Sequence, residues 1–135
     1  MDDLDICAVE RDPMIRRMLT FLIADSCRSF TAFDSVQRTT HAFLDGVCPI
    51  PSVVILDYLT ARESPNEELL ALYALTRGSK YVLMQFSKDD FHSLPTPLFY
   101  TEVEKPFPMS ELIAKIQLLN KANANLENTV SIAIL

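Results

Sequence analysis

Five short apolar runs alternate with amphipathic segments along most of this chain, and this alternation limits the folds that it can adopt. The runs cover residues 4–9, 29–33, 52–57, 80–86 and 98–103. Runs of this length are typical of strands buried on both faces, and the intervening segments have helical spacing. Because parallel strands need crossover connections, we predict an α/β fold with a five-stranded, doubly wound parallel sheet.

Helix-start signals follow three of these runs. Asp12 and Pro13 have the pattern of an N-cap and a first helical residue. Asp34 is expected to cap the second helix. The stretch 64–67 has the pattern of a capping box, with Pro65 at the first helical position. The fourth connection, residues 87–97, has room only for a shortened helix, because its two prolines cannot continue one.

Composition indicates a globular domain and excludes several classes of protein. The 135 residues are 49% hydrophobic, which suits one domain with a buried core. The net charge of -6 disfavours direct binding of nucleic acid. The acidic N-terminus and the lack of a long apolar run predict a cytoplasmic protein without a membrane segment. Cys7, Cys27 and Cys48 are widely spaced, which indicates reduced, buried thiols.

The C-terminal part of the chain differs in composition from the rest. We place a domain at residues 1–120 and a tail or linker at 121–135. The tail begins polar and ends in the apolar stretch 130–135. This end is unusual for a free monomer, so it is expected to pack on the domain, to pair with another chain, as in a homodimer, or to begin a longer segment.

Three charged residues follow or end strands that the pattern predicts. Glu10 follows the first strand, Asp57 ends the third, and Lys105 follows the fifth. In an open parallel sheet, ligands bind at the carboxyl ends of the strands. These residues are therefore expected to converge at one end of the sheet.

The segments around these residues resemble a known family. They are residues 9–13 (Val-Glu-Arg-Asp-Pro), 53–57 (Val-Val-Ile-Leu-Asp) and 105–107 (Lys-Pro-Phe). In this order they resemble the receiver domain of two-component response regulators, over about residues 4–120. The resemblance implies a flavodoxin-like, CheY-like sheet with strand order 2-1-3-4-5.

The resemblance also implies roles for the three charged residues. Asp57 would be the phosphoacceptor, Glu10 an acid of a magnesium site shared with Asp57, and Lys105 the contact to the phosphoryl oxygens. These residue types suit such chemistry, because a carboxylate nucleophile forms an acyl phosphate and magnesium binds few carboxylates plus phosphate oxygens. The expected donor is a histidine kinase or a phosphotransfer protein.

Two positions depart from the family pattern. Arg11 stands where the family has a second acidic magnesium ligand, so the metal site is expected to be weakened. Arg11 is either a surface residue or a fixed cation that reaches Asp57 or Glu10 in place of the metal. Phe86 stands where the family has its switch hydroxyl, and Ser87, one residue later, would point the other way along a strand.

Two functions follow from these patterns. The first is a receiver domain in a phosphorelay, which accepts a phosphoryl group on Asp57 with weakened chemistry and acts through contacts with a downstream protein. The second is a phosphorylation-independent pseudo-receiver that serves as a protein-binding module. A phosphatase would need an acid where Leu59 stands, so we do not expect an enzyme.

Overall fold

The computed structural model describes the backbone of residues 1–134 and the side chains of residues 1–121. Its strands are β1 (Asp5–Val9), β2 (Ser29–Phe33), β3 (Val53–Asp57), β4 (Lys80–Gln85) and β5 (Tyr100–Glu104). Its helices are α1 (Pro13–Ile23), α2 (Val36–Leu44), α3 (Tyr58–Glu63), α4 (Asn66–Leu75) and α5 (Met109–Ile134), with 3-10 turns η1 (Ala24–Ser26) and η2 (Asp90–Ser93).

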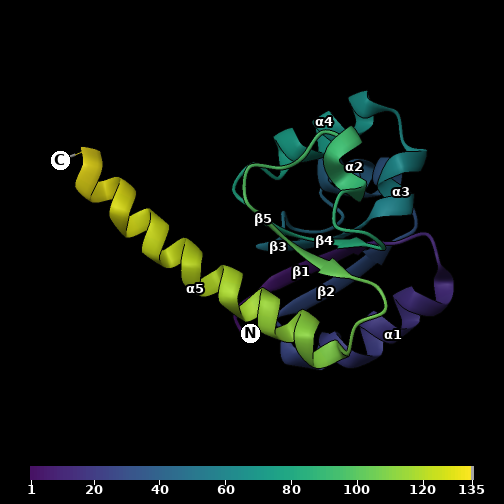
Figure 1. Ribbon diagram of the computed structural model, residues 1–135, viewed down its shortest axis with the longest axis horizontal. Helices are drawn as coiled ribbons and strands as arrows, with labels where there is room; N and C mark the ends of the chain where they lie inside the picture. Colours follow the sequence, from purple (N-terminus) through teal and green to yellow (C-terminus); the bar gives the residue numbers. More distant parts are fainter. Residues whose placement is uncertain (135) are drawn as a thin grey trace.

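The five strands form one parallel sheet with the order β2-β1-β3-β4-β5 (Figure 1). Each run predicted as a strand overlaps a strand of this sheet. Both the α/β class and the strand order implied by the resemblance are therefore confirmed.

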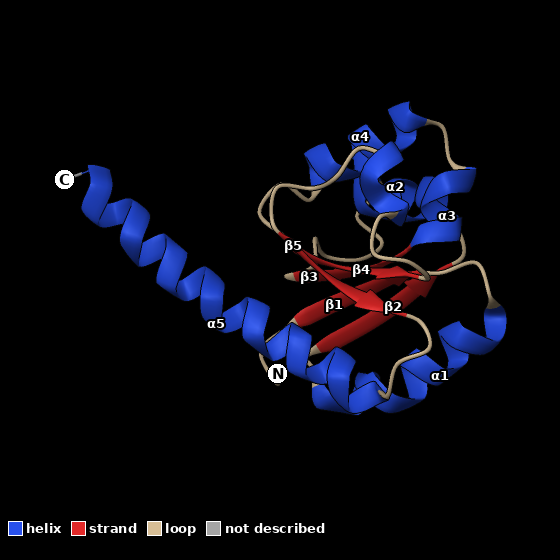
Figure 2. Ribbon diagram, viewed as in Figure 1, coloured by secondary structure: helices blue, strands red, loops and turns tan. Residues whose placement is uncertain are grey.

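Helices cover both faces of the sheet (Figure 2). Alternate residues of a strand point to opposite faces, so Ile6 of β1 packs with the α1 and α5 side and Cys7 with the other side. On the first face, Leu19 of α1 and Leu112 of α5 are fully buried. On the second face, α2, α3 and α4 supply the apolar residues. The sheet thus separates two cores.

Two of the predicted helix caps are wrong, and one is confirmed. Asp12 caps α1, and Pro13 is the first helical residue. At α2 the cap is Ser35, whose hydroxyl accepts a hydrogen bond from the backbone N–H of Arg38. Asp34 instead pairs with the Arg38 side chain.

At α4, the capping box predicted over residues 64–67 does not form. Pro65 is itself the N-cap residue, without a side-chain hydrogen bond. The Ser64 hydroxyl turns back to the carbonyl of Thr60. The reason is α3, an unpredicted short helix that ends at Glu63 and uses the residues just before α4 for its own C-terminus.

Between β4 and β5 the chain forms only the short turn η2, as the prolines predict. The three cysteines are free thiols; Cys7 is buried, whereas Cys27 and Cys48 are half-buried, which corrects the prediction for the latter two.

The last helix is continuous through the boundary predicted at residue 120. It starts against the sheet and leads away from it to the C-terminus (Figure 1). The division into a domain and a tail stays a prediction. No helix within the described residues is both long and apolar enough to cross a membrane.

Candidate functional site

Glu10, Asp57 and Lys105 meet at the carboxyl end of the sheet. Glu10 follows β1, Asp57 is the last residue of β3, and Lys105 follows β5. The Lys105 ammonium lies 2.9 Å from Glu10 Oε1 and 2.8 Å from Asp57 Oδ1, so one cation bridges two carboxylates. Parallel register places these strand ends side by side, which is why residues so far apart in sequence come together.

A fourth residue, Thr60, completes this cluster and was not predicted. Its hydroxyl oxygen lies 2.8 Å from Asp57 Oδ2 and 3.3 Å from Glu10 Oε2, and it accepts a hydrogen bond from the backbone N–H of Arg11. The Thr60 backbone N–H also donates to Asp57 Oδ2, because Asp57 is the N-cap of α3. The sequence holds one signal for this helix, since aspartate is a preferred N-cap residue.

The cluster is almost closed to solvent. Glu10 and Asp57 are each 1% exposed and Thr60 is 2% exposed. Unpaired charges at this depth would be strongly unfavourable, so the two carboxylates depend on Lys105 and on the Thr60 hydroxyl.

Burial and pairing shift the acidities of all three charged groups. Burial, reinforced by the neighbouring Asp57, raises the pKa of Glu10 to about 7. Burial also disfavours the ionised form of Asp57, but hydrogen bonds with Glu10, Lys105 and Thr60 outweigh this effect and lower its pKa. For Lys105, burial is outweighed by the two carboxylates, which raise its pKa. Glu10 is therefore the member of the cluster that takes up a proton near neutral pH.

Arg11 does not act as a fixed cation in this cluster, which corrects one of the two alternatives. Its guanidinium is exposed and pairs with Glu63 at the end of α3. The neighbouring Arg16 donates to the backbone carbonyls of Glu10 and Arg11, which holds the turn between β1 and α1.

Neither candidate for the switch position places a hydroxyl at the cluster. Phe86, just after β4, is 53% exposed, and its ring centre lies 5.5 Å from the Lys105 ammonium. Ser87 is exposed, and its backbone N–H donates to Asp90. A switch role for Ser87 stays a prediction.

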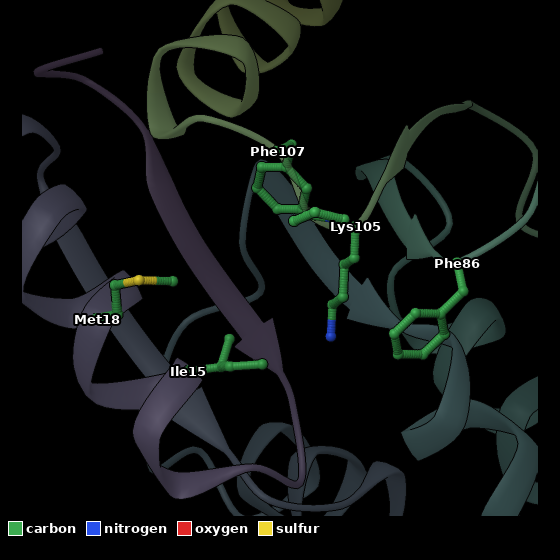
Figure 3. A pocket seen from close by; sticks show the side chains of 6 residues that line it. Ile15, Met18, Phe86, Lys105 and Phe107 are labelled. Atoms are coloured by element: carbon green, nitrogen blue, oxygen red, sulfur yellow. The ribbon is translucent and has the colours of Figure 1, made fainter.

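An apolar cavity opens beside the cluster, between α1 and the ends of β4 and β5 (Figure 3). Its volume is about 310 Å³. It is lined by Ile15, Met18, Phe86, Lys105, Pro106 and Phe107. Lys105 thus lines this cavity and also belongs to the charged cluster, where its ammonium group contacts the two carboxylates.

The residues at this site do not fit a magnesium ion in the observed arrangement. Magnesium takes oxygen ligands in an octahedron and usually keeps several waters. Here each of the four oxygens of the two carboxylates lies beside Lys105 or Thr60, and the cluster is nearly closed to water. Among the described residues, no group of three or more His, Cys, Asp or Glu side chains is arranged to hold a metal ion.

No protein-family model and no curated protein matches this chain. Solved structures do match. One is the N-terminal domain of a response regulator/sensory box/GGDEF protein from Carboxydothermus hydrogenoformans, with 15% identity, a TM-score of 0.64, and coverage of 90% of this chain and 98% of that one. Another is the receiver domain of the PhyR response regulator from Erythrobacter litoralis, with 16% identity, a TM-score of 0.64, and coverage of 88% and 91%. The chain has the fold of a receiver domain.

A third match is to part of a longer protein. It is the anti-anti-sigma factor PhyR from Bartonella quintana, with 14% identity and a TM-score of 0.69. The match covers 96% of this chain but only 52% of PhyR. At such identities the likeness is one of fold, and the chemistry of the site has to be argued from its own residues.

Proposed function

We propose that this chain is a receiver-fold signalling domain that acts through protein contacts and does not depend on phosphoryl transfer to Asp57. The observation that carries this proposal is the state of Asp57. Its side chain is buried, Oδ1 is held by Lys105, and Oδ2 accepts two hydrogen bonds from Thr60. The signalling role is supported by the matched response regulators, whose fold the chain shares.

Phosphoryl acceptance requires a carboxylate oxygen that can reach an incoming phosphorus atom. A nucleophile must have a free lone pair and an open approach. To expose Asp57 Oδ2, the Thr60 hydroxyl would have to move and α3 would lose its N-cap. The lack of a fitting metal site also leaves the charge of a phosphoryl group opposed only by Lys105, next to a second carboxylate.

A second function, phosphoryl acceptance on Asp57 from a histidine kinase or phosphotransfer protein, is favoured by one observation. Lys105 lies 2.8 Å from Asp57 at the carboxyl end of the sheet, where it would contact a phosphoryl oxygen. Under this alternative, magnesium would bind Glu10 and Asp57 after the cluster has opened. Contacts with a downstream protein and a homodimer are compatible with both functions and stay predictions.

One experiment separates the two functions. The full chain is incubated with acetyl phosphate, or with beryllofluoride, in the presence of magnesium, and is then analysed by intact mass and by NMR. We expect no phosphoryl adduct and no shift of the amide signals around Asp57. An adduct that is lost in Asp57→Asn and kept in the exposed control Asp45→Asn would instead support phosphoryl acceptance.

A cellular test uses the same pair of variants. Asp57→Asn keeps a polar cap for α3 and is expected to leave both the fold and the cellular phenotype unchanged. A lost phenotype with an intact circular dichroism spectrum, and with Asp45→Asn still active, would contradict the proposal.

A further inference from the structure

Thr60 makes more contacts in the charged cluster than its place in a helix requires. As the third residue of α3, it satisfies the Asp57 cap with its backbone N–H alone. Its hydroxyl makes further contacts, because it lies between the two carboxylates, on the side that Lys105 does not occupy. The N–H of Arg11 holds the hydroxyl oxygen in place at 2.9 Å.

We infer that Thr60 closes this cluster against divalent cations, so that the chain keeps its two carboxylates stable without a metal. The inference rests on the proposed function, which it deepens by naming the residue that makes the site independent of magnesium. Thr60 would act as a positioning residue.

The inference follows from which oxygens are in use. Lys105 contacts Glu10 Oε1 and Asp57 Oδ1, so a bridging cation would have to bind Oε2 and Oδ2. These are the two oxygens beside the Thr60 hydroxyl. A magnesium ion would also need room for water ligands, and the Thr60 side chain is buried at that point. The single hydroxyl proton can be donated to one of these oxygens while the hydroxyl oxygen lies against the other, and the Thr60 side chain fills the space that a cation would need.

The net charge of the cluster favours the binding of cations, which the Thr60 hydroxyl opposes. Two carboxylates and one ammonium leave a net charge of about -1 when Glu10 is ionised, which attracts cations. Removal of the hydroxyl would leave Oε2 and Oδ2 facing a small vacant volume with fewer donors. A magnesium ion that gives up some of its waters is then expected to bind these two oxygens, because buried carboxylate oxygens without partners are unfavourable.

The test is a titration of the full chain with magnesium chloride, followed by NMR of the backbone amides at pH 8. Wild type and Thr60→Ser, which keeps the hydroxyl, are expected to show no saturable shift at Glu10, Arg11 or Asp57. Thr60→Ala is expected to show a saturable shift at these residues and to bind magnesium at least tenfold more tightly than wild type. The double variant Thr60→Ala with Asp57→Asn should lose this binding.

Two outcomes would overturn the inference. One is saturable magnesium binding at these residues in wild type, a test that does not depend on a variant that folds. The other is a folded Thr60→Ala that binds no better than wild type.

The proposed function can be disproved without disproving the inference on Thr60. If wild type is phosphorylated by acetyl phosphate, while in the unphosphorylated state only Thr60→Ala binds magnesium, the proposed function is wrong and the inference on Thr60 is upheld. If Thr60→Ala gains magnesium binding and wild type stays unphosphorylated, both are supported.

Discussion

A single lysine serves two buried carboxylates at the carboxyl end of the sheet, and this arrangement sets the energetics of the site. The Lys105 side chain is 14% exposed, whereas those of Glu10 and Asp57 are 1% and 2% exposed. A buried pair is a weak source of net stability, but removal of one partner leaves uncompensated charge at low dielectric. Removal of Lys105 alone is therefore expected to destabilise the protein strongly, although the complete cluster contributes little net stability compared with apolar residues in its place.

Lys105→Met is expected to lower the free energy of unfolding by about 3 kcal/mol at pH 8, because both carboxylates lose their cation. At pH 6 the loss should be smaller, since protonated Glu10 no longer repels Asp57. Urea denaturation at the two pH values measures both effects. The control Lys88→Met, at an exposed position, should change stability by less than about 0.5 kcal/mol. Equal losses at both pH values would contradict the prediction.

Glu10 should make stability depend on pH near neutrality. Its pKa is about 7 in the folded chain against 4.5 for an ordinary glutamate, so between these values the folded state holds a proton that the unfolded state has released. The contribution of Glu10 to the free energy of unfolding therefore falls by about 3 kcal/mol as pH rises through this window.

Glu10→Gln removes this pH dependence. We expect the variant to gain stability relative to wild type as pH rises from 5 to 8, measured by urea denaturation in steps of pH. The exposed control Glu67→Gln should follow the wild-type curve. If the Glu10→Gln and wild-type curves stay parallel, Glu10 does not titrate in this range.

At this scale, strand position made three of the four cluster residues predictable. Glu10, Asp57 and Lys105 are charged residues next to apolar runs, and parallel strands bring such positions together. Thr60 was missed because it belongs to a helix that no periodic pattern announces. The direction of the Arg11 side chain was equally unpredictable, since it depends on Glu63 at the end of that same helix.

Among the helices, α2 illustrates how local competition decides a boundary. Asp34 and Ser35 are both good cap residues, and the backbone turn places the Ser35 oxygen 3.1 Å from the N–H of Arg38. Asp34 is left to pair with the exposed Arg38 side chain.

Ser35→Ala should lower the free energy of unfolding by about 1 kcal/mol, because α2 loses its cap. Asp34 is half-buried, and its Oδ1 has no hydrogen-bond partner among the described residues. Asp34→Ala therefore removes only the weak ion pair with the exposed Arg38 side chain and should change the free energy of unfolding by less than about 0.5 kcal/mol. Urea denaturation of both variants tests the assignment. The opposite ranking would restore Asp34 as the cap.

The elements themselves were predictable to different degrees. Strands and the helices α1, α2, α4 and α5 follow from apolar period, whereas α3, at six residues, is too short for its period to be recognised. The η2 turn was foreseen as short because prolines exclude a longer helix.

As a whole, the molecule has two cores that share one sheet. Ile6 of β1 faces the core with α1 and α5, and Cys7, the next residue, faces the core with α2, α3 and α4. Neither core can lose its strands without exposing the other. The two faces are therefore expected to unfold together.

This coupling predicts two-state unfolding in urea. Tyr73 and Tyr81, whose rings meet edge to face at 5.4 Å, report on the second face, while far-ultraviolet circular dichroism also reports on α1 and α5. The transitions seen by tyrosine fluorescence and by circular dichroism should coincide. Separate midpoints would show that the faces unfold independently.

The last helix, α5, is long, and its first turns are anchored in the core. At 26 residues α5 is about 39 Å long, and Leu112 and Ile116 anchor its first turns in the core. Only a short loop separates its start at Met109 from Lys105 in the charged cluster. A tilt of about 5° at this base would carry the far end by about 3 Å. A small tilt at the base of α5, beside the charged cluster, would therefore be enlarged along the helix toward its far end.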